Sequence, residues 1–468
     1  MKTTVRAAAF LPIVALPCLP SSGVAQTDTL DFGPLESVVE AELVATGVPG
    51  AAVAVVIGDR LVFAEGFGVA DVETRAEVTP RTLFRIASTT KMLTAAAMVT
   101  LAERGTVDLH EPVRRYVPGL PPGLGQLTLH QLLSHTAGLR DASSFYGPHD
   151  DAALADFVSS WTDDYLVAEP GEIFSYSNLG LVLAGRVLEA ALDRPYADAM
   201  KEVLFDPLGM ERTTLRPGMA MTYPVAQGHE PSAGETGPTV VRPYSHDVRY
   251  APAGGVFTSA ADFARFAIAF LNDGVIDGEQ VLPPSAIEKL ATPHADVPSS
   301  DPAEHLAHGY GLNVRDHRGV RVVQHGGLRV GFGSLVRLIP EHRVAVLILT
   351  NSTNGLLLKS LETATELAVR LQPPSPAPEP TPVSMDPAEM REYAGIYENA
   401  PDYLRLELIV EDGRLFLAQE GQPGRTEVRK IGPERFAAGG TGFLLIHGRR
   451  NGVVFMHIAA HALRKLSN

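Results

Sequence analysis

The chain has 468 residues, of which 45% are hydrophobic and 20% charged, and its formal net charge is −15 at pH 7. This length exceeds what one ordinary hydrophobic core supports, so two or more domains are expected. The acidic balance, which no basic stripe offsets, argues against a nucleic-acid partner.

The N-terminus has the pattern of a secretory signal peptide, which is removed on export. An apolar run, Ala7–Leu19, follows two basic residues, and small residues around Ala25 provide a cleavage site. The run is too short and too interrupted by prolines to span a bilayer. We therefore expect residues 1–25 to be a signal peptide, and the mature protein to be periplasmic or secreted without stable membrane insertion. Cleavage would remove the sole cysteine, Cys18, whose lipidation is disfavoured by the preceding Pro17.

The next segments predict a helix, a strand pair and a long helical region. Residues 35–47 repeat apolar positions at helical spacing and end at Gly47. Residues 51–68 form two apolar runs around Gly58-Asp59, which predicts a hairpin of buried strands. Helical patterns and loops then dominate residues 101–272.

Strand signals return after this helical region. Residues 310–327 and 333–351 are each typical of two strands joined by a polar turn, and residues 355–371 predict a closing helix. Strands at both ends of the segment therefore flank helices. One sheet built from sequence-distant strands, with an inserted helical lobe, accounts for this order.

A proline-rich linker separates this part from the C-terminus. Residues 372–384, "QPPSPAPEPTPVS", contain six prolines in thirteen positions, which indicates a stiff, extended connection. Residues 385–468 contain short alternating apolar runs between glycine turns. They predict a small all-β module.

Several common catalytic patterns are absent from the sequence. No serine lies in a G-x-S-x-G elbow, and there is no H-E-x-x-H, Walker A or dinucleotide fingerprint. The nearest histidine pairs are His305/His308, in a loop flanked by Gly and Pro, and His457/His461, which has no obvious third ligand. We therefore expect no metal ion and no organic cofactor.

One stretch, "FRIASTTKMLTAAAMVTLAERG", places Ser88 and Lys91 three residues apart at the start of an apolar helix. Positions at this spacing share one helix face, so the hydroxyl and the amine lie side by side. The pair is either a helix N-cap beside a solvated lysine or a nucleophile beside its base. Lysine acts as a base only where burial or a neighbouring charge lowers its pKa. The spacing alone leaves both interpretations open.

Two later segments favour the catalytic interpretation. "PGEIFSYSNLG" places Tyr176 and Asn178 at a turn before an apolar helix, and "VVQHGGL" places His325 and Gly327 at the end of a strand. Each segment also has an ordinary structural interpretation, as turn residues or as a strand-end histidine bonded to backbone. His135, in "LLSHTAGL", is a further alternative as the histidine of a Ser–His pair.

In chain order, these motifs are S-x-x-K, Y-x-N and H-x-G, and they resemble those of the serine β-lactamase-related family. That family includes class C β-lactamases, D-alanyl-D-alanine peptidases, D-aminopeptidases and family VIII-type esterases. The resemblance implies an α/β, three-layer sandwich over residues 26–371, with an antiparallel sheet between helices plus a helical lobe. Residues 385–468 resemble the lipocalin-like β-barrel attached to many members. In the family, the histidine at the position of His135 is structural.

The resemblance also implies catalytic roles. Ser88 would attack a carbonyl and form an acyl-enzyme, while Lys91 and Tyr176 exchange protons. Which of the two is the base stays open.

The remaining implied roles concern substrate binding. Asn178 and His325 would orient the substrate, and Gly327 would let backbone approach it closely. The backbone N–H groups of Ser88 and Leu328 would form an oxyanion hole.

The sequence departs from many relatives at His325, where β-lactamases carry lysine. Histidine is mostly neutral at pH 7, so recognition of an anionic substrate at this position is expected to be weaker. We expect an exported serine hydrolase acting on an uncharged small-molecule or peptide ester or amide. The alternatives are a penicillin-binding DD-peptidase or β-lactamase, and a catalytically idle binding or scaffold protein.

Overall fold

The structure is a computed structural model that describes residues 30–231, 237–299, 305–353, 355–373, 382–400, 404–448 and 453–466. The expected signal peptide, residues 1–25, and most of the proline-rich linker lie outside the described residues. Within the described ranges, no helix is long and apolar enough to cross a membrane.

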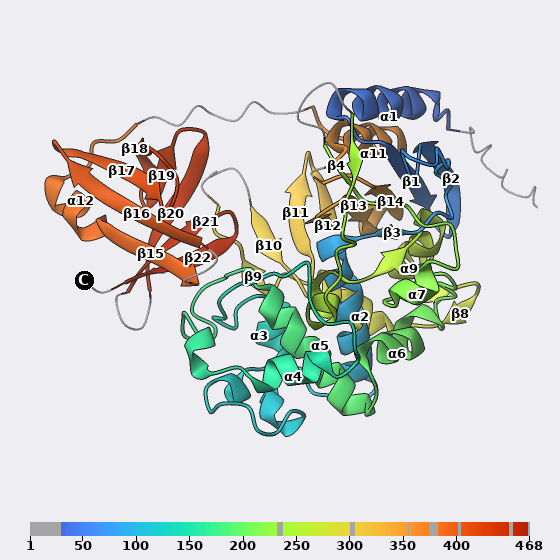
Figure 1. The fold of residues 1–468 in the computed structure, drawn as a ribbon, viewed down its shortest axis with the longest axis horizontal. Helices are drawn as coiled ribbons and strands as arrows, with labels where there is room; N and C mark the ends of the chain where they lie inside the picture. The colour runs from blue at the N-terminus through green and yellow to red at the C-terminus, as the bar shows by residue number, and fades with distance from the viewer. Residues whose placement is uncertain are drawn as a thin grey trace, which may run out of the picture. The chain divides into compact units, whose positions relative to one another are not determined.

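An eight-stranded antiparallel sheet forms the centre of the first domain (Figure 1), in the order β2-β1-β14-β13-β12-β11-β10-β9. Its strands are β1 (Gly50–Ile57), β2 (Arg60–Gly68), β9 (Ala295–Asp296), β10 (Leu306–His308), β11 (Asn313–His317), β12 (Val320–Arg329), β13 (Phe332–Ile339) and β14 (Val344–Thr350). Ala51 pairs with Thr350, so the two ends of the domain meet in one sheet. This confirms the sheet expected from sequence-distant strands.

Helices cover both faces of the sheet. The side chains of β1 alternate: Val53 and Val55 pack with α1 (Gly33–Thr46) and α11 (Leu358–Ala368), whereas Ala52 and Ala54 join the core on the opposite face. That second core includes α2 (Thr90–Glu103) and α9 (Ala260–Leu271). The expected three-layer sandwich is therefore confirmed.

Short helices and small ladders build the inserted lobe. The helices are α3 (Leu129–Leu133), α4 (Ala153–Ser159), α5 (Asn178–Leu192), α6 (Tyr196–Met200), α7 (Pro217–Ala220), α8 (Ala251–Gly254) and α10 (Pro284–Ala291). The strands are β3 (Phe84–Arg85), β4 (His229–Glu230), β5 (Thr239–Val240), β6 (Phe257–Thr258), β7 (Val275–Ile276) and β8 (Glu279–Gln280). Strand β3 pairs with β6, which joins the segment before Ser88 to the end of the lobe.

The C-terminal module is a closed eight-stranded barrel. Its strands are β15 (Gly395–Ala400), β16 (Leu404–Glu411), β17 (Arg414–Gln419), β18 (Arg425–Gly432), β19 (Arg435–Ala438), β20 (Thr441–His447), β21 (Val454–Ile458) and β22 (His461–Lys465). The module is not purely β, because helix α12 (Pro387–Tyr393) precedes the barrel. Asp386 caps this helix by accepting a hydrogen bond from the backbone N–H of Ala388, and Pro387 suits its first turn.

Candidate active site

Ser88 lies in a 3₁₀ turn, Ala87–Thr89, immediately before α2. Helix α2 begins at Thr90, two residues after Ser88, so the 3₁₀ turn that contains Ser88 leads directly into the helix. Ala87 has a φ of 46°, in the left-handed region that a residue with a Cβ adopts at a cost. The strained turn presents the half-buried Ser88 side chain to a cavity.

Strand β13 holds this turn in place. Ser334 Oγ donates to the carbonyl of Ile86 at 2.7 Å. With its only proton used there, Ser334 Oγ accepts from Thr89 Oγ1, also at 2.7 Å. These buried hydrogen bonds fix both flanks of Ser88 to the central sheet.

Lys91 is completely buried, so it is not the solvated lysine of the N-cap interpretation. Its Nζ donates to Ser88 Oγ at 3.1 Å, Asn178 Oδ1 at 2.7 Å and the carbonyl of Ala253 at 2.9 Å. Burial lowers the pKa of Lys91 to about 7, although the charge of Asp141 acts in the opposite direction. A large fraction of Lys91 is therefore neutral near pH 7 and able to accept a proton.

A buried carboxylate, Asp141, orients Asn178. Asp141 accepts from the backbone N–H of Asn178 at 2.6 Å and from its side-chain Nδ2 at 3.2 Å. Since the amide nitrogen faces Asp141, the amide oxygen faces Lys91. Asp141 could not be recognised from the sequence, because a single aspartate in a loop has no motif that would connect it to Asn178.

Tyr176 covers the lysine from the other side. The ring centroid of Tyr176 lies 4.8 Å from Lys91 Nζ and 6.4 Å from the ring centroid of His325. The backbone of Tyr176 is held by the turn between β21 and β22: its N–H donates to the carbonyl of Ala460 at 2.9 Å, and its carbonyl accepts from His461 Nδ1 at 3.1 Å. The barrel therefore contacts the candidate site directly.

His135 supports the Tyr176 segment. Its ring centroid lies 4.5 Å from that of Tyr176, and its Nδ1 accepts from the backbone N–H of Ser177 at 3.2 Å. Burial, followed by the charge of nearby His308, lowers the pKa of His135 well below its usual value. These contacts favour the structural role of His135 over a Ser–His pair.

Strand β12 forms the wall beside Ser88. A Cβ added to Gly327 would lie 2.3 Å from the carbonyl oxygen of Ile86 and 3.0 Å from the backbone nitrogen of Ser88, so only glycine fits. Leu328, the next residue, is 45% exposed, whereas Gly327 and Arg329 on either side of it are buried. In the described ladder, pairing of β11 with β12 ends at Gln324. The β12 edge beyond that point is therefore open beside the nucleophile.

His325 also lies on β12, and its imidazole is uncharged. Its Nδ1 donates to the carbonyl of Gly326 at 2.5 Å. Burial, followed by the charge of Lys91, lowers the pKa of His325 to about 3. Position 325 therefore supplies a neutral imidazole rather than the fixed positive charge that lysine would provide.

Four of the seven predicted site residues line one cavity of about 260 Å³. Its lining includes Ser88, Tyr176, Asn178 and Leu328. Lys91 lies behind Ser88 and Asn178, whereas His325 lies farther along β12. The groups collected in this way are those of acyl transfer: a hydroxyl beside a buried amine, and backbone donors nearby.

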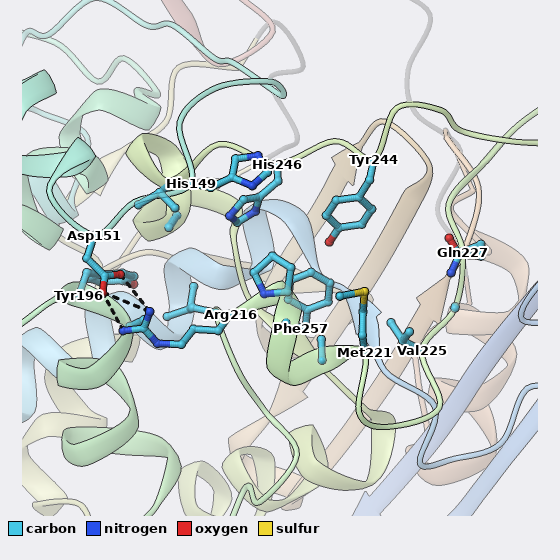
Figure 2. A pocket seen from close by; sticks show the side chains of 18 of the residues that line it. His149, Asp151, Tyr196, Arg216, Met221, Val225, Gln227, Tyr244, His246 and Phe257 are labelled. Carbon is cyan, nitrogen blue, oxygen red and sulfur yellow. Dashed lines mark hydrogen bonds and ion pairs between the residues drawn. The ribbon is translucent and has the colours of Figure 1, made fainter.

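A second cavity, of about 620 Å³, has a mostly apolar lining that includes none of these four residues. Figure 2 shows its lining side chains. Figure 2 shows Arg216 paired with Asp151 at one end of this cavity. Tyr244 and Phe257 line it elsewhere, and the guanidinium of Arg85 lies 5.6 Å and 4.9 Å from their ring centroids. Arg85 itself lines the smaller cavity, so its guanidinium links that cavity to these two aromatic rings of the larger one.

Comparisons with known proteins show the family and the fold of this chain. The Beta-lactamase family profile matches residues 35–371. Penicillin-binding protein 4 of Amycolatopsis lactamdurans is 31% identical over 363 residues, which cover 75% of this chain and 93% of that protein. The crystal structure of SurE, with 27% identity, covers 92% of this chain and 98% of its own, with a TM-score of 0.77. The D-amino acid amidase from Ochrobactrum anthropi SV3, in complex with L-phenylalanine amide, is 25% identical with a TM-score of 0.58, covering 71% of this chain and 97% of its own.

Proposed function

Because this chain belongs to the Beta-lactamase family, we propose that it is a serine hydrolase that forms an acyl-enzyme on Ser88 with ester or amide substrates. The observation that carries the proposal is the 3.1 Å distance between Lys91 Nζ and Ser88 Oγ, short enough for the hydroxyl to donate to the amine when Lys91 is neutral. Burial lowers the pKa of this lysine to about 7, so its neutral form is available to take the serine proton.

The proposed reaction begins with proton transfer from Ser88 Oγ to neutral Lys91. Oγ attacks the substrate carbonyl, and the backbone N–H groups of Ser88 and Leu328 donate to the developing oxyanion. Lys91, directly or through Tyr176, then protonates the leaving alcohol or amine as the tetrahedral intermediate collapses. A water molecule releases the acyl group from Ser88 by the same steps in reverse. Tyr176 as the primary base remains the alternative assignment.

Asn178 contributes to the proposed reaction by holding the Lys91 amine in place. Its amide oxygen accepts from Lys91, and its amide nitrogen is held by Asp141. This arrangement keeps the amine directed at Ser88 between the acylation and deacylation steps. We also propose that the protein acts after export, because residues 1–25 have the pattern of a signal peptide.

A penicillin-binding peptidase or β-lactamase is the second candidate. The observation in its favour is the 31% identity to penicillin-binding protein 4. The buried, neutral His325 weighs against it, since the family's lysine at that position would offer a fixed charge to the carboxylate of a penicillin.

The test compares mature wild-type protein with Ser88→Ala on p-nitrophenyl butyrate and on nitrocefin. We expect ester turnover that Ser88→Ala abolishes, together with mass-spectrometric labelling of Ser88 by a fluorophosphonate. Ser37→Ala, an exposed serine on α1, serves as the matched control and should retain activity. Efficient nitrocefin turnover would favour the β-lactamase assignment. Equal rates for wild type and Ser88→Ala, with no labelling, would contradict the proposal and favour the idle scaffold.

A further inference from the structure

The second cavity, of about 620 Å³, has the size and the walls of a small-molecule site. Such sites usually have volumes of roughly 300–1,000 Å³ and are lined mostly by apolar and aromatic side chains. Tyr244 and Phe257 stack in this lining with ring centroids 6.3 Å apart, and Val225 packs in the same cluster as Phe257. Met221 also lines the cavity (Figure 2), and this residue is 73% exposed. This part of the cavity therefore offers uncovered apolar surface to a hydrocarbon group.

Arg216 lies in another part of the lining, together with Asp151 (Figure 2). Its guanidinium lies 3.0 Å from the carboxylate of Asp151 and 2.9 Å from that of Asp198. One positive charge therefore faces two negative charges, which leaves an excess of negative charge. An anionic ligand group would find the guanidinium already paired with both carboxylates. This part of the cavity favours a cation over an anion.

Glu189, on α5, adds a buried carboxyl group to the same lining. The residue is 7% exposed, and its Oε1 accepts from the backbone N–H of Tyr196 at 3.0 Å. Its Oε2 lies 3.5 Å from Arg186, which is a long distance for an ion pair. Burial raises the pKa of Glu189 to about 7, although the hydrogen bond from Tyr196 acts in the opposite direction. The neighbouring groups therefore compensate this carboxylate incompletely, and it has further positions at which it can accept a hydrogen bond.

His246 provides a second acceptor in the lining. The residue is 2% exposed, and its Nδ1 is buried without a hydrogen-bond partner among the described residues. Burial, followed by the charge of Arg85, lowers the pKa of His246 to about 3, so the imidazole is neutral and one of its nitrogens carries no proton. A buried polar atom without a partner is unfavourable, and a ligand N–H can donate to Nδ1 when the ring proton is on Nε2. The cavity thus combines two buried acceptors with an apolar surface.

We propose that this cavity is a second ligand site, which binds an organic amine. The ammonium group donates to Glu189, and the apolar body of the ligand packs against Tyr244 and Phe257. An ammonium carries a positive charge and three N–H donors, so it supplies the charge that Glu189 lacks and a donor for His246. An alcohol would supply a donor without the charge, and a carboxylate would supply neither. The inference goes beyond the proposed function, because it concerns a ligand other than the substrate of Ser88.

This amine site is separate from the Ser88 cavity. The two linings share no residue in the part of the chain that the structure describes. Helix α8 nevertheless contributes to both, because Ala251 lines the amine site and Ala253 lines the Ser88 cavity. Since no lining residue is shared, we expect the amine and an ester substrate to bind at the same time.

The binding test uses three ligands that share one apolar body: 4-phenylbutylamine, 4-phenylbutanol and 4-phenylbutyrate. Calorimetric titration of the mature protein is carried out at pH 8, above the pKa of Glu189. The amine should bind at least about tenfold more tightly than the alcohol, the effect of one charge-assisted hydrogen bond, and the anionic acid should bind most weakly.

Glu189→Gln should remove the preference for the amine, because glutamine keeps an acceptor for the N–H of Tyr196 but carries no charge. The matched control is Glu40→Gln, at an exposed position on α1, which removes the same charge elsewhere and should keep the preference. Thermal unfolding checks that both variants are folded. Equal binding of amine and alcohol, absence of amine binding, or a preference that survives Glu189→Gln would overturn the inference.

Two further measurements locate the bound amine. In a crystal structure of wild-type protein with 4-phenylbutylamine, the ammonium should lie within about 3 Å of a Glu189 carboxylate oxygen, with the phenyl ring against Phe257. In steady-state kinetics, the amine concentration that saturates the calorimetric site should leave KM for p-nitrophenyl butyrate unchanged. An amine located only in the Ser88 cavity, or competitive inhibition at that concentration, would overturn the inference. The calorimetric and crystallographic results require no turnover, so they test the amine site even if Ser88 proves not to be a nucleophile.

Discussion

Lys91 Nζ lies 2.7 Å from Asn178 Oδ1, and this amide is fixed in turn by the buried carboxylate of Asp141. The lysine is thus completely enclosed, yet its nearest side-chain partners are an amide and a hydroxyl rather than an acid. That environment explains why burial dominates and lowers its pKa to about 7.

The first prediction concerns pH. Because only neutral Lys91 accepts a proton, kcat/KM for p-nitrophenyl butyrate should rise as the pH increases through about 7 and then level off. Lys91→Met should lower kcat by roughly 10²–10⁴-fold, the usual contribution of a general base. Steady-state rates between pH 5 and 9 provide the measurement. If the same rise of kcat/KM with pH persists in Lys91→Met, the titrating group is not Lys91 but another group, such as Tyr176.

Asp141→Asn should move this pH profile to lower pH. The negative charge of Asp141 raises the pKa of Lys91, so its removal lowers that pKa further. The ascending limb would then begin at a lower pH. Asp151→Asn, at a partly exposed carboxylate paired with Arg216 outside the Ser88 cavity, should leave the limb in place. A uniform loss of rate at every pH, without displacement of the limb, would show that Asp141 acts only by holding Asn178.

Gly327→Ala should abolish turnover, whereas Gly326→Ala should not. The new methyl at Gly327 would lie 2.3 Å from the carbonyl oxygen of Ile86 and 3.0 Å from the backbone nitrogen of Ser88. At Gly326 the nearest atom, Leu335 Cδ2, would be at 3.5 Å, an ordinary contact. Fluorophosphonate labelling and ester hydrolysis report the difference, and thermal unfolding checks that both variants are folded. Comparable activity of the two variants would contradict the close approach of β12 to Ser88.

His461→Ala should reduce kcat by about tenfold, the effect of losing one partly buried hydrogen bond that positions Tyr176. His461 Nδ1 donates to the carbonyl of Tyr176 at 3.1 Å, across 285 residues of sequence. The matched control is His447→Ala, a partly exposed barrel histidine whose Nε2 contacts Glu392. If His461→Ala and His447→Ala have the same kcat, the barrel does not position Tyr176.

Acid should destabilise the protein through its buried histidines. Burial lowers the pKa of His308 to about 4, whereas the unfolded chain takes up this proton near pH 6.5. Since the unfolded state then binds more protons, stability falls as the pH drops from 6.5 towards 4, by about 1.4 kcal/mol per pH unit for this group. Urea unfolding at pH 7.5 and pH 5 should show a smaller acid-induced loss for His308→Gln than for wild type. His342→Gln, at an exposed position, should show the wild-type loss.

The sequence predicted the elements whose signals are local. The helix ending at Gly47 and the strand pairs around β12 and β13 follow from residue periodicity and turn chemistry, and all are present. Ser88 and Asn178, which the motifs single out, both lie within hydrogen-bond distance of Lys91.

The features that the sequence did not predict depend on tertiary contacts. Asp141 and Arg85 belong to no motif, and their importance comes from partners on distant segments. The His461 contact joins two domains, so neither domain's own pattern could indicate it. Helix α12 had a recognisable Asp-Pro start, but its seven residues are too few for helical periodicity to stand out among short strands.

The hydrogen bond from Ser334 to Ile86 has a consequence for biosynthesis. It spans 248 residues, and it steadies a turn in which Ala87 has an unfavourable backbone conformation. A ribosome releases the Ser88 segment long before β13 and β14, so a nascent chain lacks the support that this turn requires. The nucleophile is therefore assembled late, when the last strands of the sheet close onto the first. Incomplete chains, although they contain Ser88 and Lys91, would be hydrolytically silent until that closure.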